Sequence, residues 1–144
     1  MQVLLDTHVL IWMGSDPARL SDKAAETLRD PSITLLISPA SLWKLAIKLG
    51  RGRISLHGGI EAFANRLLSL RRTRWLGITP SHLAAVAQLP PHHGDPFDRL
   101  LIAQALVEAA PLVSKDAAFG AYTELQRIWQ LTGRRRWPTA ACTR

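Results

Sequence analysis

Cysteine and long apolar runs are scarce in this chain of 144 residues. The single cysteine, Cys142, stands near the C-terminus, so no disulfide can form within the chain. A thiol in a terminal tail is also a poor candidate for a catalytic nucleophile. No apolar run approaches the ~20 residues that span a bilayer, and the first residues lack the basic segment and apolar core of a secretory signal. We therefore expect a cytoplasmic protein without a membrane span.

Acidic residues are also few, because 11 Asp and Glu stand against 18 Lys and Arg, which gives a formal net charge of +7. The hydrophobic content of 47% and the charged content of 20% are typical of a globular chain rather than a disordered one. A chain of this length forms one domain with a sizeable core. Its positive charge fits a polyanionic partner such as nucleic acid, although solubility alone also explains it.

Short apolar runs alternate with segments of helical periodicity along the chain. This alternation predicts a three-layer α/β fold with a central, mainly parallel sheet flanked by helices. We expect one domain over residues 1–131 and a basic tail over residues 132–144. The expected strands are 3–5, 33–37, 75–78, 112–114 and an edge strand at 127–129. The expected helices are 6–13, 21–30, 38–49, 59–70, 80–89, 95–109 and a short turn at 117–122.

Three aspartates stand where apolar segments stop. Asp6 and Asp116 follow the first and fourth expected strands, and Asp98 lies in the first turn of the helix that begins near Asp95. Ligand sites of parallel α/β folds lie at the carboxyl ends of the strands, so the three carboxylates can converge there and bind a hard divalent cation. Taken singly, each has another explanation as a helix cap or turn residue. Asp95, followed by Pro96, is assigned mainly to capping.

Lys44 is unexpected in its position. Its neighbours Leu42, Trp43, Leu45 and Ile47 make the helix apolar nearly all round, which predicts a largely buried helix. A buried lysine is costly unless it meets a carboxylate or a wet cavity. The three aspartates could supply that partner, or the side chain could extend along its own stem to the surface.

Two further groups are candidates for function. His92 and His93 could bind a metal or act as a general base, but adjacent histidines in a loop cannot easily face one metal together. Arg71, Arg72 and Arg74 could bind an RNA backbone, or could form a solvated basic surface.

The chain resembles PIN-domain ribonucleases, specifically VapC-type toxins of bacterial toxin–antitoxin pairs. The resemblance rests on four stretches at the expected spacing, which together extend over residues 2–129, and Asp95–Ala105 is the most specific part. The stretches are Leu4–Trp12, Ser38–Lys48, Leu89–Ala105 and Leu112–Asp116.

The resemblance implies an endoribonuclease that depends on Mg²⁺ or Mn²⁺ and cuts structured RNA such as tRNA or rRNA. It further implies a homodimer and a cognate antitoxin, with Asp6, Asp98 and Asp116 as metal-binding acids. The family pattern has glutamate where this chain has Lys44. Exchanging a carboxylate for an ammonium removes an oxygen ligand and adds a positive charge, and both changes oppose metal binding. We therefore expect this chain to be weakly active or inactive, whether Lys44 is natural divergence or a loss-of-function change.

Three functions remain open. In the first, the acids support metal-dependent hydrolysis of RNA phosphodiester bonds. In the second, Lys44 pairs with the acids in place of a metal, and the protein binds RNA or antitoxin without cutting. The third is a phosphoacceptor domain, which ranks lowest because Thr7 and His8 stand where a second acid beside Asp6 would be needed.

Overall fold

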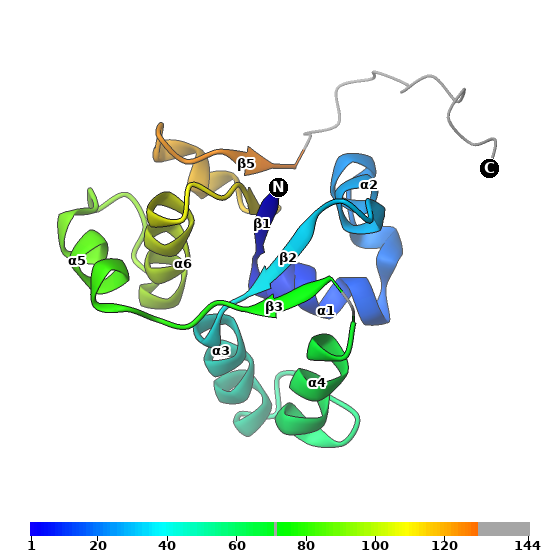
Figure 1. The fold of residues 1–144 in the computed structure, drawn as a ribbon. Helices are drawn as coiled ribbons and strands as arrows, with labels where there is room; N and C mark the ends of the chain where they lie inside the picture. The colour runs from blue at the N-terminus through cyan, green and yellow to red at the C-terminus, as the bar shows by residue number, and fades with distance from the viewer. Residues whose placement is uncertain (71, 130–144) are drawn as a thin grey trace.

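A five-stranded sheet with helices on both faces forms the body of the protein (Figure 1). The structure, a computed structural model, describes residues 1–70 and 72–129. In chain order the elements are β1 (Gln2–Leu5), α1 (Thr7–Ser15), the 3₁₀ turn η1 (Pro17–Arg19), α2 (Asp22–Arg29), β2 (Thr34–Ile37), α3 (Pro39–Gly50), α4 (Gly59–Leu68), β3 (Thr73–Trp75), α5 (Pro80–Gln88), α6 (Pro96–Val107), β4 (Leu112–Val113), the 3₁₀ turn η2 (Ala117–Ala121) and β5 (Arg127–Ile128).

The strand order is β3-β2-β1-β4-β5, and each described strand pair is parallel. Because all these strands point the same way, their carboxyl ends share one edge of the sheet. The prediction of a three-layer α/β fold with a parallel sheet is confirmed.

Alternate side chains of the strands divide the core into two layers. Val3 and Leu5 of β1 belong to a cluster on one face with residues of α1, α2, α3 and α4. Leu4 belongs to the opposite cluster, where Leu101 and Ile102 of α6 cover the sheet. Helix α5 packs on α6. The inner strands β1, β2 and β4 therefore need apolar residues on both faces, which is why they appear in the sequence as continuous apolar runs.

Helix starts at the carboxyl edge follow from local chemistry. Ser38 caps α3 by accepting a hydrogen bond from the amide of Ala40, and Pro39 occupies the first helical position. The Ser38 hydroxyl also donates to the side-chain oxygen of Gln104, which is fully buried in α6. This contact joins the start of α3 to the second half of α6.

The third strand differs from the prediction. It covers Thr73–Trp75 rather than residues 75–78, so it begins inside the expected basic connection. Beyond Leu76, whose amide still donates to Ile37, the backbone leaves the sheet. The Gln104 side chain lies within 3.3 Å of the Leu76 carbonyl and 3.5 Å of the Gly77 carbonyl. A side chain from α6 therefore takes over the backbone bonding that strand pairing would have supplied, which no local pattern indicates.

Other boundaries differ by a few residues. Helix α1 continues through Gly14 to Ser15, and α4 ends at Leu68 rather than 70. Helix α6 ends at Val107 because Ala109 takes a left-handed conformation (φ 50°) and the amide of Ala110 bonds back to Ala105.

The expectation that α3 is largely buried holds for one side of the helix, and Trp43 departs from it. The Trp43 side chain is 61% exposed, and the buried residues of α3 are confined to Ala40, Ser41, Leu42 and Leu45. Trp43 instead makes an edge contact with Phe97 of α6, with ring centroids 4.9 Å apart. Helix α3 therefore contributes Leu42 and Leu45 to the core and leaves Trp43 at the surface beside Lys44.

Two expectations concern other parts of the molecule. Among the described residues, no helix combines the length and the apolar character needed to cross a membrane. The expected tail at residues 132–144, with Cys142, lies outside the described residues, as does Arg71.

Candidate active site at the carboxyl edge of the sheet

Asp6 is the most deeply placed acid of the site and is 4% exposed. It follows β1 directly and caps α1, with Oδ1 accepting from the amide of Thr7 at 2.6 Å. Its other oxygen, Oδ2, accepts from the Ser114 hydroxyl at 2.6 Å. Asp6 therefore caps α1 and also stands among the acids of the site, so the two explanations offered by the sequence hold together.

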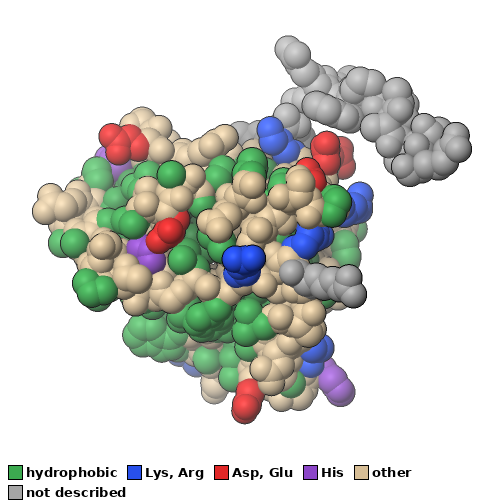
Figure 2. Space-filling model, in the orientation of Figure 1, with side chains coloured by type: hydrophobic (Ala, Val, Ile, Leu, Met, Phe, Trp, Pro, Cys, Tyr) green, Lys and Arg blue, Asp and Glu red, His purple; other side chains and the backbone are tan. Residues whose placement is uncertain are grey.

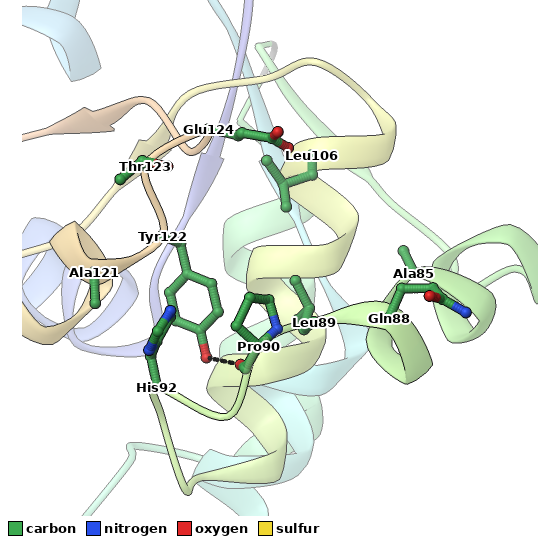
Figure 3. A pocket seen from close by; sticks show the side chains of 10 residues that line it. All are labelled: Ala85, Gln88, Leu89, Pro90, His92, Leu106, Ala121, Tyr122, Thr123 and Glu124. Carbon is green, nitrogen blue, oxygen red and sulfur yellow. Dashed lines mark hydrogen bonds between the residues drawn. The ribbon is translucent and has the colours of Figure 1, made fainter.

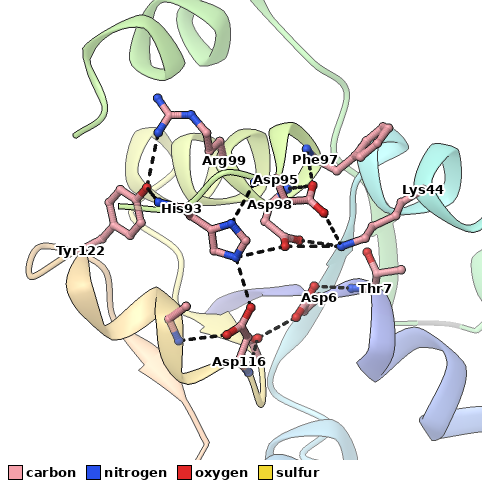
Figure 4. A network of polar contacts seen from close by, with 12 residues as sticks. Asp6, Thr7, Lys44, His93, Asp95, Phe97, Asp98, Arg99, Asp116 and Tyr122 are labelled. Atoms are coloured by element: carbon pink, nitrogen blue, oxygen red, sulfur yellow. Dashed lines mark hydrogen bonds and ion pairs between the residues drawn. The ribbon is translucent and has the colours of Figure 1, made fainter. Parts of the chain in front are cut away.

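Asp98 and Asp95 come from the start of α6. Asp95 is the N-cap, and its Oδ1 accepts from the amides of Phe97 and Asp98. This cap fixes the first turn so that Asp98 points inward, where it is 5% exposed (Figure 4). The sequence assigned Asp95 mainly to capping, whereas its second oxygen also takes part in the site.

Lys44 binds both of these aspartates. Its Nζ lies 3.1 Å from Oδ2 of Asp95, and 3.2 and 3.4 Å from the two oxygens of Asp98. An ammonium has three donors, and these three contacts account for them. The Lys44 side chain is 15% exposed, so it extends into the acidic cluster and not along its stem to the surface.

His93 connects Asp98 to the third acid. Its Nε2 lies 3.3 Å from Oδ2 of Asp98 and 3.2 Å from Oδ2 of Asp116. Its Nδ1 accepts the backbone N–H of Asp95 at 3.1 Å. A neutral ring that accepts at Nδ1 carries its proton on Nε2, so His93 donates to both carboxylates. Sequence reasoning kept His93 only as a candidate paired with His92, and the folded loop shows that a single histidine turns inward.

Asp116 completes the cluster at the surface end, where its side chain is 41% exposed. Its Oδ1 caps η2 through the amide of Ala118, and its own amide donates to Ser114. Ser114 thus contacts both Asp6 and Asp116 and holds the ends of β1 and β4 together. The structure brings Asp6, Asp98 and Asp116 to one edge, together with Lys44.

Burial and like charges make the centre of this cluster difficult to ionise. Desolvation raises the pKa of Asp98 to about 6, with the charges of Asp6 and Asp95 adding to the rise and Lys44 opposing it. The same ion pairs raise the pKa of Lys44 against the effect of its own desolvation. Lys44 is therefore a permanent cation within the cluster.

The donor set, as its side chains stand, does not fit a divalent cation. Ligand atoms of His93, Asp98 and Asp116 lie within 4.8 Å of one another, which suits a metal by distance alone. However, the Nε2 that faces the two acids carries a proton and has no lone pair to offer. Lys44 meanwhile contacts both oxygens of Asp98. Two donors thus occupy the positions from which the acids would bind a metal.

The loop that carries His93 is held by Tyr122. The Tyr122 hydroxyl donates to the carbonyl of Pro90 and accepts from the amide of His93. His92 turns the other way and contacts the Tyr122 ring, with centroids 5.2 Å apart. There it lines a separate pocket of about 440 Å³ between α5, α6 and η2, away from the acids (Figure 3).

Of the predicted RNA-binding arginines, Arg74 lies on β3 and Arg72 directly precedes this strand, whereas Arg71 is outside the described residues. Arg72 directs its guanidinium to the carbonyls of Asp30 and Leu28 at the end of α2. Arg74 is exposed. Arg72 is therefore engaged in the fold, whereas Arg74 faces solvent.

Comparison with known proteins decides the family. A sequence model of the PIN domain matches residues 3–125. The chain belongs to the PIN domain family. It is 36% identical over 115 residues to "Ribonuclease VapC22" of Mycobacterium tuberculosis (strain ATCC 25618 / H37Rv), an alignment that covers 79% of this chain and 86% of that protein. The resemblance inferred from the sequence is confirmed.

Solved structures agree with the PIN fold. VapBC2 from Rickettsia felis, bound to a DNA fragment from its promoter, superposes with a TM-score of 0.69 at 18% identity and covers 90% of this chain and 100% of that one. VapBC-1 from nontypeable Haemophilus influenzae gives a TM-score of 0.63 at 20% identity, with 88% and 96% covered. At these identities the likeness concerns the fold.

Proposed function

We propose that this PIN-domain protein is the toxin of a toxin–antitoxin pair, an endoribonuclease that works in the cytoplasm and is impaired by Lys44. The convergence of Asp6, Asp98 and Asp116 at the carboxyl edge of the sheet carries the proposal. The 36% identity to a protein named as a ribonuclease supports it. The substrate would be structured RNA such as tRNA or rRNA.

The contacts of Lys44 explain the proposed impairment. Hydrolysis of a phosphodiester requires stabilisation of charge that develops on the phosphate oxygens. Lys44 directs its ammonium at Asp95 and Asp98 and not outward, so it offers no donor to a phosphate. The acids that remain repel the phosphate rather than stabilise it.

The Lys44→Glu variant tests this proposal. We expect it to cut RNA in Mg²⁺ or Mn²⁺ and not in EDTA, whereas the chain as it stands cuts at least ~100-fold more slowly, the scale on which loss of one charge-stabilising interaction slows an enzyme. Lys23→Glu is the matched control, because Lys23 is exposed on α2 and the substitution makes the same change of net charge. Equal cleavage by the native chain and by Lys44→Glu would show that Lys44 does not impair the site.

Metal binding has a readout that does not depend on activity. A cation that binds only the folded state raises the melting temperature, with about 2.7 kcal/mol gained at 100 times its Kd. We expect Mg²⁺ or Mn²⁺ to raise the melting temperature of Lys44→Glu and to leave that of the native chain near its value in EDTA. An equal rise in the melting temperature of both proteins would contradict the conclusion that the native site does not fit a divalent cation.

A second candidate is a binding module that holds RNA or antitoxin without cutting. The closed network of Lys44 with Asp95 and Asp98 favours it, because the ammonium satisfies the acids without a metal. If Lys44→Glu also fails to cut a broad pool of cellular RNA while both chains bind it, this second function replaces the first.

We further propose a homodimer, a cognate antitoxin partner, and RNA contacts by Arg71, Arg72 and Arg74. Arg74 is the better placed of the two described arginines, because the guanidinium of Arg72 is already bonded to two carbonyls.

A further inference from the structure

Basic and aromatic side chains from separate segments meet around Trp12 of α1. The imidazole of His8 stacks on the indole, with centroids 5.4 Å apart and planes inclined by 28°. Arg19 of η1 and Lys115, which follows β4, place their charged groups 5.6 and 5.7 Å from the centre of the indole. We call these four residues the Trp12 patch.

The Trp12 patch adjoins the acidic cluster through the chain itself. His8 is two residues after Asp6, and Lys115 directly precedes Asp116, so each segment carries an acid of the site and a member of the patch. Partial desolvation and the charge of Lys48 lower the pKa of His8, and the charges of Asp6 and Asp116 oppose this lowering in part. The patch therefore lies beside the acids that a strand of nucleic acid would approach.

The cations of the patch are held in place and still accessible. The Arg19 side chain is 63% exposed, and Lys115 and His8 are exposed as well. Trp129 packs against Trp12 at 6.2 Å and supports the indole from β5. Cation–π contacts at exposed sites contribute only a little stability, so the folded state gains little from this arrangement. A pre-positioned pair of cations does, however, lower the ordering cost of binding an anion.

The arrangement matches single-stranded RNA better than a simple anion. Proteins that bind single strands combine cations along the backbone with aromatic rings on which bases stack. The patch offers two permanent cations and one exposed aromatic ring, that of His8. Beside the patch, Asp16 is an opposing acid, 3.4 Å from Arg19 and itself 52% exposed.

We propose that the Trp12 patch binds the RNA strand beside the phosphate presented to the acidic cluster. Lys115 and Arg19 contact phosphates, and an unstacked base lies on His8. This inference rests on the proposed function in one respect, that RNA is the ligand. It assigns RNA binding to a surface on the α1 side of the site, separate from the arginines of β3.

Binding of a fluorescein-labelled 12-nucleotide RNA to the native chain tests the proposal, in EDTA and over a series of NaCl concentrations. Each phosphate contact on a single strand contributes about 0.7 to the slope of log affinity against log salt. Lys115→Ala with Arg19→Ala should therefore reduce the slope by about 1.4. His8→Ala should weaken binding about tenfold and leave the slope unchanged, because base stacking carries no counterion release.

Arg29→Ala is the matched control, since Arg29 is exposed at the end of α2 that leads into the amino end of β2. We expect it to bind like the native chain. Unchanged affinity and slope in the patch variants, or no RNA binding by the native chain at low salt, would overturn the proposal. A third outcome would also overturn the proposal: the native chain binds a poly-glutamate peptide, and the patch variants lose this binding but still bind RNA. The patch would then bind an acidic protein.

The two proposals can fail separately. If Lys44→Glu cuts RNA and patch substitutions added to it leave KM unchanged, the patch inference is wrong and the ribonuclease proposal stands. If Lys44→Glu does not cut, but the patch variants still reduce the salt slope of the native chain, the ribonuclease proposal is wrong and the patch stands.

Discussion

Lys44 and Asp98 form the contact on which the chemistry of this site depends. A buried carboxylate among other carboxylates is costly to ionise, and one ammonium at 3.2 Å offsets only part of that cost. The pKa of Asp98 therefore stays raised, at about 6, even beside Lys44. Near neutral pH the ion pair is complete, and below pH 6 the folded protein holds a proton on Asp98.

This pKa predicts a specific pH dependence of stability. Asp98 has an ordinary value of 3.8, so between about pH 4 and pH 6 the folded state binds more protons than the unfolded state. The contribution of Asp98 to the free energy of unfolding should then fall as the pH rises through that window. Urea titrations of the native chain and of Asp98→Asn, in EDTA at pH 4, 5, 6 and 7, measure it. We expect the free energy of unfolding of the native chain, minus that of Asp98→Asn, to fall from pH 4 to pH 6, and a rise of this quantity with pH would contradict the account.

At the scale of elements, the sequence predicted what local chemistry controls. The starts of α3 and α6 are predicted by a capping residue followed by proline, Ser38 with Pro39 and Asp95 with Pro96. The acids at the ends of β1 and β4 could be placed at one edge because parallel strands share an edge. Those predictions used only neighbours in the chain and the rule for parallel sheets.

The features that sequence reasoning missed depend on contacts between distant residues. His93 enters the site because Tyr122, 29 positions later, holds its loop. The place of β3 depends on Gln104 and on Arg72, which bond to backbone carbonyls of other elements. The ambiguity at Lys44 was of the same kind, since its partners lie more than 50 positions away. The pairing with an acid was foreseen, but the exposure of its neighbour Trp43 was not.

Substitutions of Arg72 and Arg74 should differ in their effect on stability, because Arg72 bonds to the fold and Arg74 faces solvent. The Arg72 guanidinium bonds to the carbonyls of Leu28 and Asp30, so Arg72→Ala should lower the free energy of unfolding by roughly 2 kcal/mol, the scale of hydrogen bonds from a charged donor. Arg74→Ala removes an exposed side chain and should change stability by less than about 0.5 kcal/mol. Urea unfolding of both variants measures this difference, and comparable losses would contradict the assignment.

At the scale of the whole molecule, apolar surface is concentrated in one segment of the chain. Several of the exposed large hydrophobic side chains lie in residues 68–83, which run from the end of α4 through the outer strand β3 into α5. They are Leu68, Leu70, Trp75, Ile78 and Leu83. The face shown in Figure 2 has hydrophobic side chains gathered across its lower half, with acidic and basic groups scattered around them. Exposed apolar surface of this kind marks a protein interface, and an outer strand left unpaired is a further liability.

We expect this segment to contact a second copy of the chain. In light scattering after gel filtration, the native protein should have twice the 15.9 kDa mass of one chain. Leu83→Glu places a charge at a position that is 55% exposed in the single chain, where it costs little. In an apolar interface the same charge would be desolvated without a partner, so the dimer should weaken at least about tenfold. Ala18→Glu is the matched control, since Ala18 is exposed in η1, outside the segment, and the substitution makes the same change of net charge. A native monomer, or a Leu83→Glu protein that dimerises as tightly as Ala18→Glu, would exclude the segment as the dimer interface and leave its apolar surface to the antitoxin.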